Sequence, residues 1–297
     1  MPVTSVDIPT LSGITLKGDL YPAAEYGAAV ILTPGFNCTK EMFVPDVALY
    51  FQSKGFTALA YDPRSTGASG GVPRNNIDPM AQVEDYSDAL TFLAQQPTVD
   101  PTRIAFWGFS FAGAVSLCAA ALDRRAKAVI AVCPLTRFEY TPELLPKVLS
   151  KAMKDRESQL QGNPPFYFPM IDENGENAAG FGLGVEKENY ALLLNAKREV
   201  APTFELQTTV QTYYKLFMWQ PFALWRHVTP TPLLMIVPEK DKVSPAELQI
   251  KHFHSMPEPK TLHVAADRGH MDVLSGDGFP RLMDMQIGFL NDKLAED

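Results

Sequence analysis

Short, continuous apolar runs alternate along the chain with stretches in which apolar side chains recur at helical spacing. The apolar runs predict strands at 28–32, 57–61, 104–107, 128–132, 232–237 and 261–264. The helical stretches predict helices at 47–53, 80–96, 112–118, 245–256 and 279–294. Two further strand-like runs flank Ser12-Gly13 and predict an N-terminal hairpin. Unbroken apolar strands that alternate with helices indicate an α/β fold with a mostly parallel central sheet and helices on both faces.

The alternation stops between residues 136 and 226. This segment of 91 residues holds 14 Phe, Tyr and Trp, against 17 in the remaining 206 residues. A helical insertion that packs a small core of its own would explain the enrichment. A cap that lines a pocket would explain it too, since ligand sites are lined largely by apolar and aromatic side chains. We expect a core formed by 1–135 and 227–297 and a cap insertion at 136–226, with both explanations open.

Composition and charge argue against nucleic acid and membranes as binding partners. The 297 residues are 46 % hydrophobic and 20 % charged, as in a globular protein with a full core. The net charge of −8 argues against a nucleic-acid partner, because such proteins carry a basic surface. No apolar run approaches a membrane span, and no secretory signal is visible, so we expect a cytoplasmic protein with no membrane partner. Cys38, Cys118 and Cys133 are too widely spaced to predict a disulfide framework or a zinc site.

The stretch AFWGFSFAG, residues 105–113, carries the strongest chemical signal. It places Ser110 between an apolar strand and a helix of small residues, with Gly108 before it and Ala112 and Gly113 after it. Small residues at these positions let a strand and a helix pass closely and hold the hydroxyl on a strained turn above the sheet. An ordinary tight turn is the competing interpretation. A serine nucleophile also needs a base within hydrogen-bond reach and an acid that orients the base.

Two later sites supply the base and the acid. Asp241 follows the strand at 232–237, and His270 follows the strand at 261–264. Both lie after strand carboxyl ends, where ligands gather in open α/β sheets. Glu239 is the competing acid. The other histidines are His227, His252, His254 and His263. His252 and His254 are expected on an exposed helix face and His263 lies within a strand, whereas His270 alone lies in a loop at the right place in the chain order, after a glycine.

The chain order Ser110, Asp241, His270 resembles that of the α/β-hydrolase superfamily, a resemblance that covers the chain outside 136–226. More narrowly, four segments are similar to the thiohydrolase and polyketide transferase enzymes of fungal secondary metabolism. These segments are LTPGFNCTKEMF, YDPRSTGASGG, DPTRIAFWGFSFAG and PMIDENGENAAGFG. The resemblance places the acid at the second carboxylate of Glu239-Lys240-Asp241. The loop beginning at Asp62 is expected to be structural, with Asp62 and Arg64 satisfying loop backbone.

The resemblance also implies how the site would work. Ser110 would attack an acyl carbonyl of an ester or thioester, with the backbone amides of Phe36 and Phe111 binding the oxyanion. Hydrolysis and acyl transfer to an alcohol remain alternatives, as does a catalytically silent binding protein or receptor. The substrate is expected to be a small molecule with an apolar acyl group. A free substrate and one bound to a carrier on a polyketide synthase are both open. No metal or organic cofactor is implied.

Substrate contacts are expected from the aromatic-rich insertion. The candidates are Trp219, Tyr140 and Met170. Cys38 is close enough to the oxyanion loop to line the pocket, whereas Cys118 and Cys133 lie in apolar runs and are expected to be buried packing residues.

Overall fold

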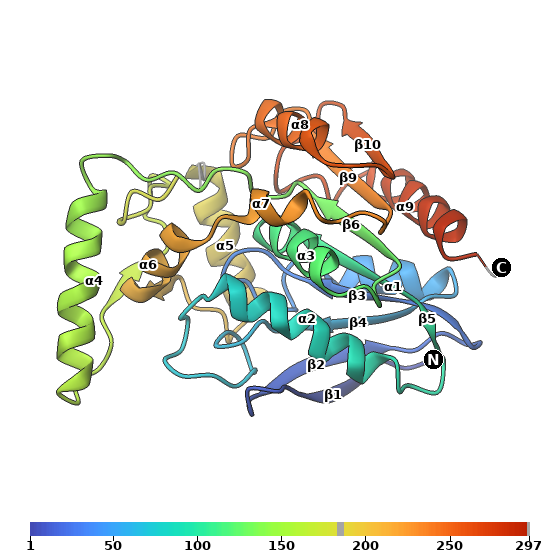
Figure 1. Ribbon diagram of the computed structural model, residues 1–297, viewed down its shortest axis with the longest axis horizontal. Helices are drawn as coiled ribbons and strands as arrows, with labels where there is room; N and C mark the ends of the chain where they lie inside the picture. The colour runs from blue at the N-terminus through green and yellow to red at the C-terminus, as the bar shows by residue number, and fades with distance from the viewer. Residues whose placement is uncertain (183–186, 296–297) are drawn as a thin grey trace.

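The apolar runs of the sequence form one eight-stranded sheet at the centre of the molecule (Figure 1). The computed structural model describes residues 1–182 and 187–295. The strands lie in the order β1 (Thr4–Pro9), β2 (Thr15–Tyr21), β4 (Thr57–Tyr61), β3 (Gly27–Thr33), β5 (Val99–Phe109), β6 (Ala128–Val132), β9 (Leu233–Pro238) and β10 (Lys260–Ala265). The β1–β2 and β2–β4 pairs are antiparallel, and the other pairs are parallel. The expected hairpin and mostly parallel sheet are confirmed.

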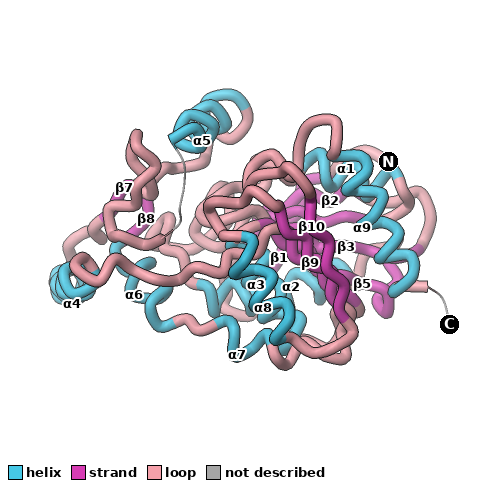
Figure 2. The backbone as a smooth tube through the Cα atoms, turned by 90° about the horizontal axis from the view of Figure 1, so that it is seen from above, coloured by secondary structure: helices cyan, strands magenta, loops and turns pink. Residues whose placement is uncertain are grey.

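Helices cover both faces of this sheet, as Figure 2 shows. The helices of the sheet region are α1 (Pro45–Ser53), α2 (Pro79–Leu93), α3 (Phe111–Leu122), α8 (Ala246–Ser255) and α9 (Phe279–Lys293). Successive side chains of a strand face opposite ways, and β5 shows the result. Phe106 packs with Tyr86 of α2, whereas the indole of the next residue, Trp107, donates to Gln286 of α9 at 2.8 Å. Accordingly α1 and α9 pack on one face and α2, α3 and α8 on the other.

Much of the chain between β6 and β9 lies beyond one end of the sheet, whereas α7 lies beside α3 (Figure 1). Its elements are α4 (Leu145–Leu160), β7 (Tyr167–Pro169), α5 (Lys187–Glu199), β8 (Gln207–Thr209), α6 (Val210–Met218) and α7 (Pro221–Trp225). It is mainly helical, as expected, but β7 and β8 also pair as a small antiparallel sheet that the sequence pattern did not predict. The boundaries of the cap at 136 and 226 stay a prediction.

This inserted segment packs into the same hydrophobic cluster as one face of the sheet. Phe181, Leu216 and Trp219 of the insertion share the cluster with Phe111 and Val115 of α3. The aromatic enrichment therefore serves packing against the core at least in part. Across the described residues, 1–182 and 187–295, no helix has both the length and the apolar character needed to cross a membrane.

Candidate active site

Ser110 lies at a sharp turn between β5 and α3. Its backbone has φ 57° and ψ −119°, a conformation that costs a residue with a side chain about 1–3 kcal/mol. The Ser110 amide donates to the carbonyl of Val132 at 2.9 Å and so fixes the turn to β6. Glycine is needed at 108 because a Cβ there would collide with the Ala112 carbonyl. The strained turn therefore holds the serine at the carboxyl end of its strand.

A hydrogen-bonded line of three buried side chains begins at this hydroxyl. Oγ of Ser110 lies 2.8 Å from Nε2 of His270, and Nδ1 of His270 lies 2.8 Å from Oδ2 of Asp241. Asp241 follows β9 and His270 follows β10, at the same edge of the sheet. In this geometry the imidazole can accept the serine proton while the carboxylate orients the ring and balances its charge. The structure brings together the three residues singled out, and their catalytic roles remain a prediction.

The competing residues lie elsewhere. The Glu239 carboxylate accepts a hydrogen bond from the Asp267 amide at 2.9 Å on the exposed side of the loops. His254 is exposed, as expected. The expectation for His252 is wrong: its ring is half-buried and stacks on Phe222, with 3.7 Å between ring centroids. A helical position that looks solvent-exposed in the sequence is covered here by α7.

Asp241 is held by two groups that the sequence analysis did not identify. The Ser244 amide donates to Oδ1 at 2.8 Å, and Nε2 of Gln249 donates to Oδ2 at 3.0 Å. The Ser244 hydroxyl in turn donates to the carbonyl of Pro134 at 2.8 Å. These hydrogen bonds fix the orientation of the carboxylate that faces His270. The local sequence pattern does not connect Ser244, or Gln249 of α8, to the acid.

Cys133 is also closer to the site than expected. Its sulfur lies 4.0 Å from Nε2 of His270, and burial together with Asp241 raises the pKa of the thiol well above its ordinary value. Within the described chain, Cys133, Asp241 and His270 are the one group of three metal-ligand side chains whose donor atoms approach within 4.8 Å. Both ring nitrogens of His270 already face Ser110 and Asp241, and the thiol is held protonated. The donor set therefore does not fit a resident metal ion.

The two amides expected to bind an oxyanion come from the first residue of α3 and from the loop after β3. Phe111 is the first residue of α3, where helix amides have no intrahelical acceptor. The Phe36 amide makes no hydrogen bond to any described part of the chain. The loop passes close to the serine, because a Cβ on Gly35 would lie 3.4 Å from Cβ of Ser110. The rings of Phe36 and Phe111 pack edge to face at 5.3 Å. This placement is compatible with the expected role, which stays a prediction.

A cavity of about 60 Å³ lies against Ser110. Its lining residues are Gly35, Phe36, Cys38, Phe109, Ser110, Met170, Asn189, Leu193, Val243, His270 and Met271. Among the described lining residues, the one clearly polar side chain besides Ser110 and His270 is that of Asn189 in α5. Burial raises the pKa of the Cys38 thiol to about 12, so this residue lines the cavity as a neutral group. A long acyl chain exceeds this volume and would extend beyond the cavity.

The three candidate substrate contacts divide between the wall and the layer behind it. Met170 lines the cavity, as expected, together with Leu193, which the sequence analysis missed. Trp219 packs behind Phe111, with 5.4 Å between ring centroids. The Tyr140 hydroxyl donates to the carbonyl of Tyr213 at 2.6 Å, away from the cavity lining. Neither of these two aromatic residues lines the cavity, and their contact with a substrate stays a prediction.

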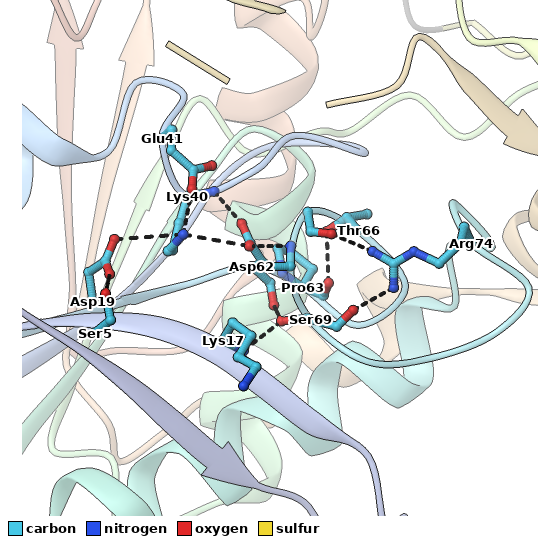
Figure 3. A network of polar contacts seen from close by, with 12 residues as sticks. Ser5, Lys17, Asp19, Lys40, Glu41, Asp62, Pro63, Thr66, Ser69 and Arg74 are labelled. Carbon is cyan, nitrogen blue, oxygen red and sulfur yellow. Dashed lines mark hydrogen bonds and ion pairs between the residues drawn. The ribbon is translucent and has the colours of Figure 1, made fainter. Parts of the chain in front are cut away.

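A buried polar network supports the loop that carries Phe36 (Figure 3). The Asp62 carboxylate accepts the amides of Lys40 at 2.7 Å and Ala68 at 2.8 Å, and the Lys40 ammonium lies 3.7 Å from it. Asp62 thus satisfies loop backbone, as expected. The expectation for Arg64 is wrong, because its guanidinium pairs with the buried carboxylate of Asp85 at 2.6 and 2.9 Å. Desolvation raises the pKa of Asp62, so the ionised form depends on these partners.

Comparison with known proteins gives a consistent picture. The family model described as "Alpha/beta hydrolase family" matches residues 30–279. A thiohydrolase of Eupenicillium brefeldianum is 54 % identical, over 97 % of this chain and 94 % of that protein. A polyketide transferase of Stachybotrys chlorohalonatus is 44 % identical, over 96 % and 95 % of the two chains. The solved structure of the alpha/beta hydrolase GrgF from a Penicillium species has a TM-score of 0.91 at 40 % identity and covers 100 % of both chains.

Proposed function

Because the chain belongs to the alpha/beta hydrolase family, we propose that it is a serine hydrolase or acyltransferase that forms an acyl-enzyme on Ser110. The observation that carries this proposal is the hydrogen-bonded line from Ser110 through His270 to Asp241. Close relatives are enzymes named thiohydrolase and polyketide transferase. A buried hydroxyl on a strained turn, paired with an imidazole that is paired with a carboxylate, is the arrangement that activates a serine.

The proposed reaction has two half-reactions. In the first, Nε2 of His270 takes the proton from Oγ of Ser110 as Oγ attacks the acyl carbonyl. The resulting oxyanion accepts the Phe36 and Phe111 amides, and its collapse expels the alcohol or thiol, which takes the proton from His270. In the second, water or an alcohol gives its proton to His270 and attacks the acyl-enzyme. The product leaves, and the proton returns to Ser110.

The substrate is proposed to be an ester or thioester of an apolar, polyketide-type acyl group. The largely apolar lining of the cavity and the names of the relatives both support this class. A carrier-bound thioester would supply a good leaving group and explain why thiohydrolases and transferases occur among such similar chains. Whether water or an alcohol completes the reaction is decided by product analysis with and without an alcohol acceptor.

The proposal is tested by labelling with a fluorophosphonate and by mass spectrometry after incubation with a panel of acyl thioesters and esters. We expect a covalent adduct on Ser110, and a loss of turnover of about 10³-fold or more in Ser110→Ala because the triad acts as a unit. Ser116→Ala is the matched control, since Ser116 is a buried serine on α3 whose hydroxyl donates to the Gly113 carbonyl. A wild-type rate in Ser110→Ala would exclude Ser110 as the nucleophile. An absence of both labelling and turnover in the wild type would favour the binding-protein alternative.

A further inference from the structure

The loop that carries Phe36 is tied to the inserted segment by the next residue, Asn37. Its side chain is buried, and its backbone has φ 57°, a left-handed conformation that asparagine tolerates better than most residues. Nδ2 of Asn37 donates to the carbonyls of Glu205 at 2.7 Å and Gln207 at 3.2 Å, just before and at the start of β8. Both amide hydrogens of Asn37 are therefore used by the backbone of the insertion.

A second asparagine completes this junction from the core. Nδ2 of Asn75 donates to Oδ1 of Asn37 at 3.0 Å. The carbonyl of Asn75 accepts the Thr209 amide at 3.1 Å and the Thr212 hydroxyl at 3.4 Å. Asn75 also adopts a positive φ, of 53°, and is buried. Three segments far apart in sequence thus meet at Asn37: the loop after β3, the loop before α2, and the chain that enters α6.

The Phe36 loop has a second anchor four residues further along, at Lys40. Figure 3 shows that anchor, in which the amide and ammonium of Lys40 both face Asp62. The Asp62 anchor lies within the core and does not involve the insertion. Asn37 is adjacent to Phe36 and is the anchor that depends on the insertion. The ring of Phe36 adds to this link, since it packs between Phe111 at 5.3 Å and Phe181 of the insertion at 6.3 Å.

We propose that Asn37 is a positioning residue that sets the Phe36 amide by tying its loop to the backbone of residues 205–207. The oxyanion-binding geometry then depends on how the insertion docks. This inference rests on the proposed function, in which the Phe36 amide binds the oxyanion. It follows because an oxyanion donor works only when it is held at hydrogen-bond distance from the developing charge before reaction. Asn37 acts through Phe36 and need not touch the substrate.

Two variants of Asn37 test this inference. Asn37→Asp keeps the shape and removes both donors to the insertion, and Asn37→Gly keeps the backbone conformation and removes the whole side chain. We expect each to lower kcat on p-nitrophenyl acetate by about 10- to 100-fold, since one oxyanion donor is worth about 10²- to 10³-fold, with KM within about twofold. A trifluoromethyl ketone forms a serine hemiketal whose oxyanion needs the same amides, so its Ki should rise by the same factor as kcat/KM falls.

Asn76→Ala is the matched control. It removes the bond between Oδ1 of Asn76 and the Thr209 hydroxyl, 2.8 Å, at the same junction. It should lower Tm and leave kcat within about twofold. If the Asn37 variants do not fold, Asn75→Asp is used instead, because it removes the donor to Oδ1 of Asn37. In this variant we expect Ki to rise and kcat/KM to fall by the same factor, which should be several-fold.

The inference is overturned if folded Asn37 variants keep a wild-type kcat, or if kcat falls while the Ki of the ketone stays unchanged. Ser110→Ala, measured in parallel, separates this failure from failure of the proposed function. If Ser110→Ala is inactive and the Asn37 variants are fully active, the positioning role of Asn37 is excluded and the proposed function stands. If Ser110→Ala is active, the proposed acyl-enzyme on Ser110 is itself excluded.

Discussion

Asp241 is the residue on which the proposed base depends for its orientation. Asp241→Asn should keep the fold and lower kcat by about 10⁴-fold, as the equivalent change does in a serine protease, because the amide stabilises the wrong imidazole tautomer. Steady-state rates on an activated ester measure the loss. Glu239→Gln is the control, because that carboxylate accepts the Asp267 amide on the exposed side of the loops. If Glu239→Gln were the damaging change, the acid would be assigned two residues too late.

The sequence identifies Ser110, Asp241 and His270 because each follows a strand and occurs in an order tied to one chemistry. It cannot identify Gln249, Ser244 or Cys133 in the same way. Gln249 reaches Asp241 because α8 turns back over the loop that follows β9. That contact is set by the path of the chain and leaves no local pattern. The supporting groups of a site are thus hidden in a single sequence even where the reacting groups are visible.

At the scale of elements, the turn from β5 to α3 requires glycine at one position. A Cβ at Gly108 would collide with the backbone of Ala112 and Gly113, which cannot move aside as a side chain can. Gly108→Ala should therefore destabilise the protein by about 1–3 kcal/mol or more, the usual cost of overpacking, and displace Ser110. Gly288→Ala is the control on α9, where a Cβ meets nothing within 4 Å. It should stabilise the protein by about 0.5–1 kcal/mol. Equal effects in urea unfolding would contradict this account of the turn.

The packing of α8 against α7 predicts a dependence of stability on pH. Burial, and then Lys251, lower the pKa of His252 from 6.5, where its ring stacks on Phe222. The imidazole of His252 therefore binds a proton more readily in the unfolded chain than in the folded one. The neutral ring contributes fully to the free energy of unfolding above about pH 6.5, and this contribution is lost as the pH falls through the pKa of the folded state.

His252→Phe keeps the stack and removes the proton site. The fall in Tm between about pH 7.5 and pH 5.5 should be smaller in this variant than in the wild type. It should not vanish, because burial lowers the pKa of His263 as well. His254→Phe adds the same ring to an exposed position of α8 and controls for the added aromatic surface. If the dependence of Tm on pH were the same in His252→Phe as in the wild type, the buried His252 ring would be excluded as its source.

The elements that the sequence predicts well are those with a long, regular pattern. The six apolar runs, from β3 to β10, and the helices of the sheet region lie where periodicity places them. The β7–β8 pair was not predicted, because each strand has only three residues and forms by pairing with a segment about forty residues away. The helix α5 escapes because it is polar on most sides and buries one side chain, Leu193. Both elements depend on tertiary contacts rather than on local sequence.

At the scale of the whole molecule, the insertion and the sheet region share one hydrophobic cluster and one cavity. Trp219, one of the aromatic residues expected to contact substrate, packs against Phe111 behind the wall. Among the described residues of the insertion, the side chains that reach the cavity are Met170, Asn189 and Leu193. The shape of the cavity therefore depends on how the insertion packs against the sheet region. A change in the wall should alter selectivity, whereas a change in the layer behind it should alter stability.

Leu193→Ala tests that separation, because this side chain is the main apolar contact that α5 makes with the cavity. Each buried CH₂ is worth about 0.8 kcal/mol, so loss of the isobutyl contact should cost about 2 kcal/mol of transition-state binding, roughly 30-fold in kcat/KM, for acyl groups long enough to reach it. An acetyl ester should be affected less, because its short acyl group buries less apolar surface against Leu193. The measurement is kcat/KM for a short and a long acyl thioester.

Trp219→Ala is the contrasting variant. Trp219 is buried against Phe111 and Phe138, and its truncation should lower the free energy of unfolding by about 3–5 kcal/mol. Its effect on kcat/KM should be the same for short and long acyl groups, since it does not line the cavity. If Trp219→Ala abolished the chain-length preference and Leu193→Ala did not, the acyl chain would have to enter the aromatic layer itself. The cavity seen beside Ser110 would then be only the entrance to its binding site.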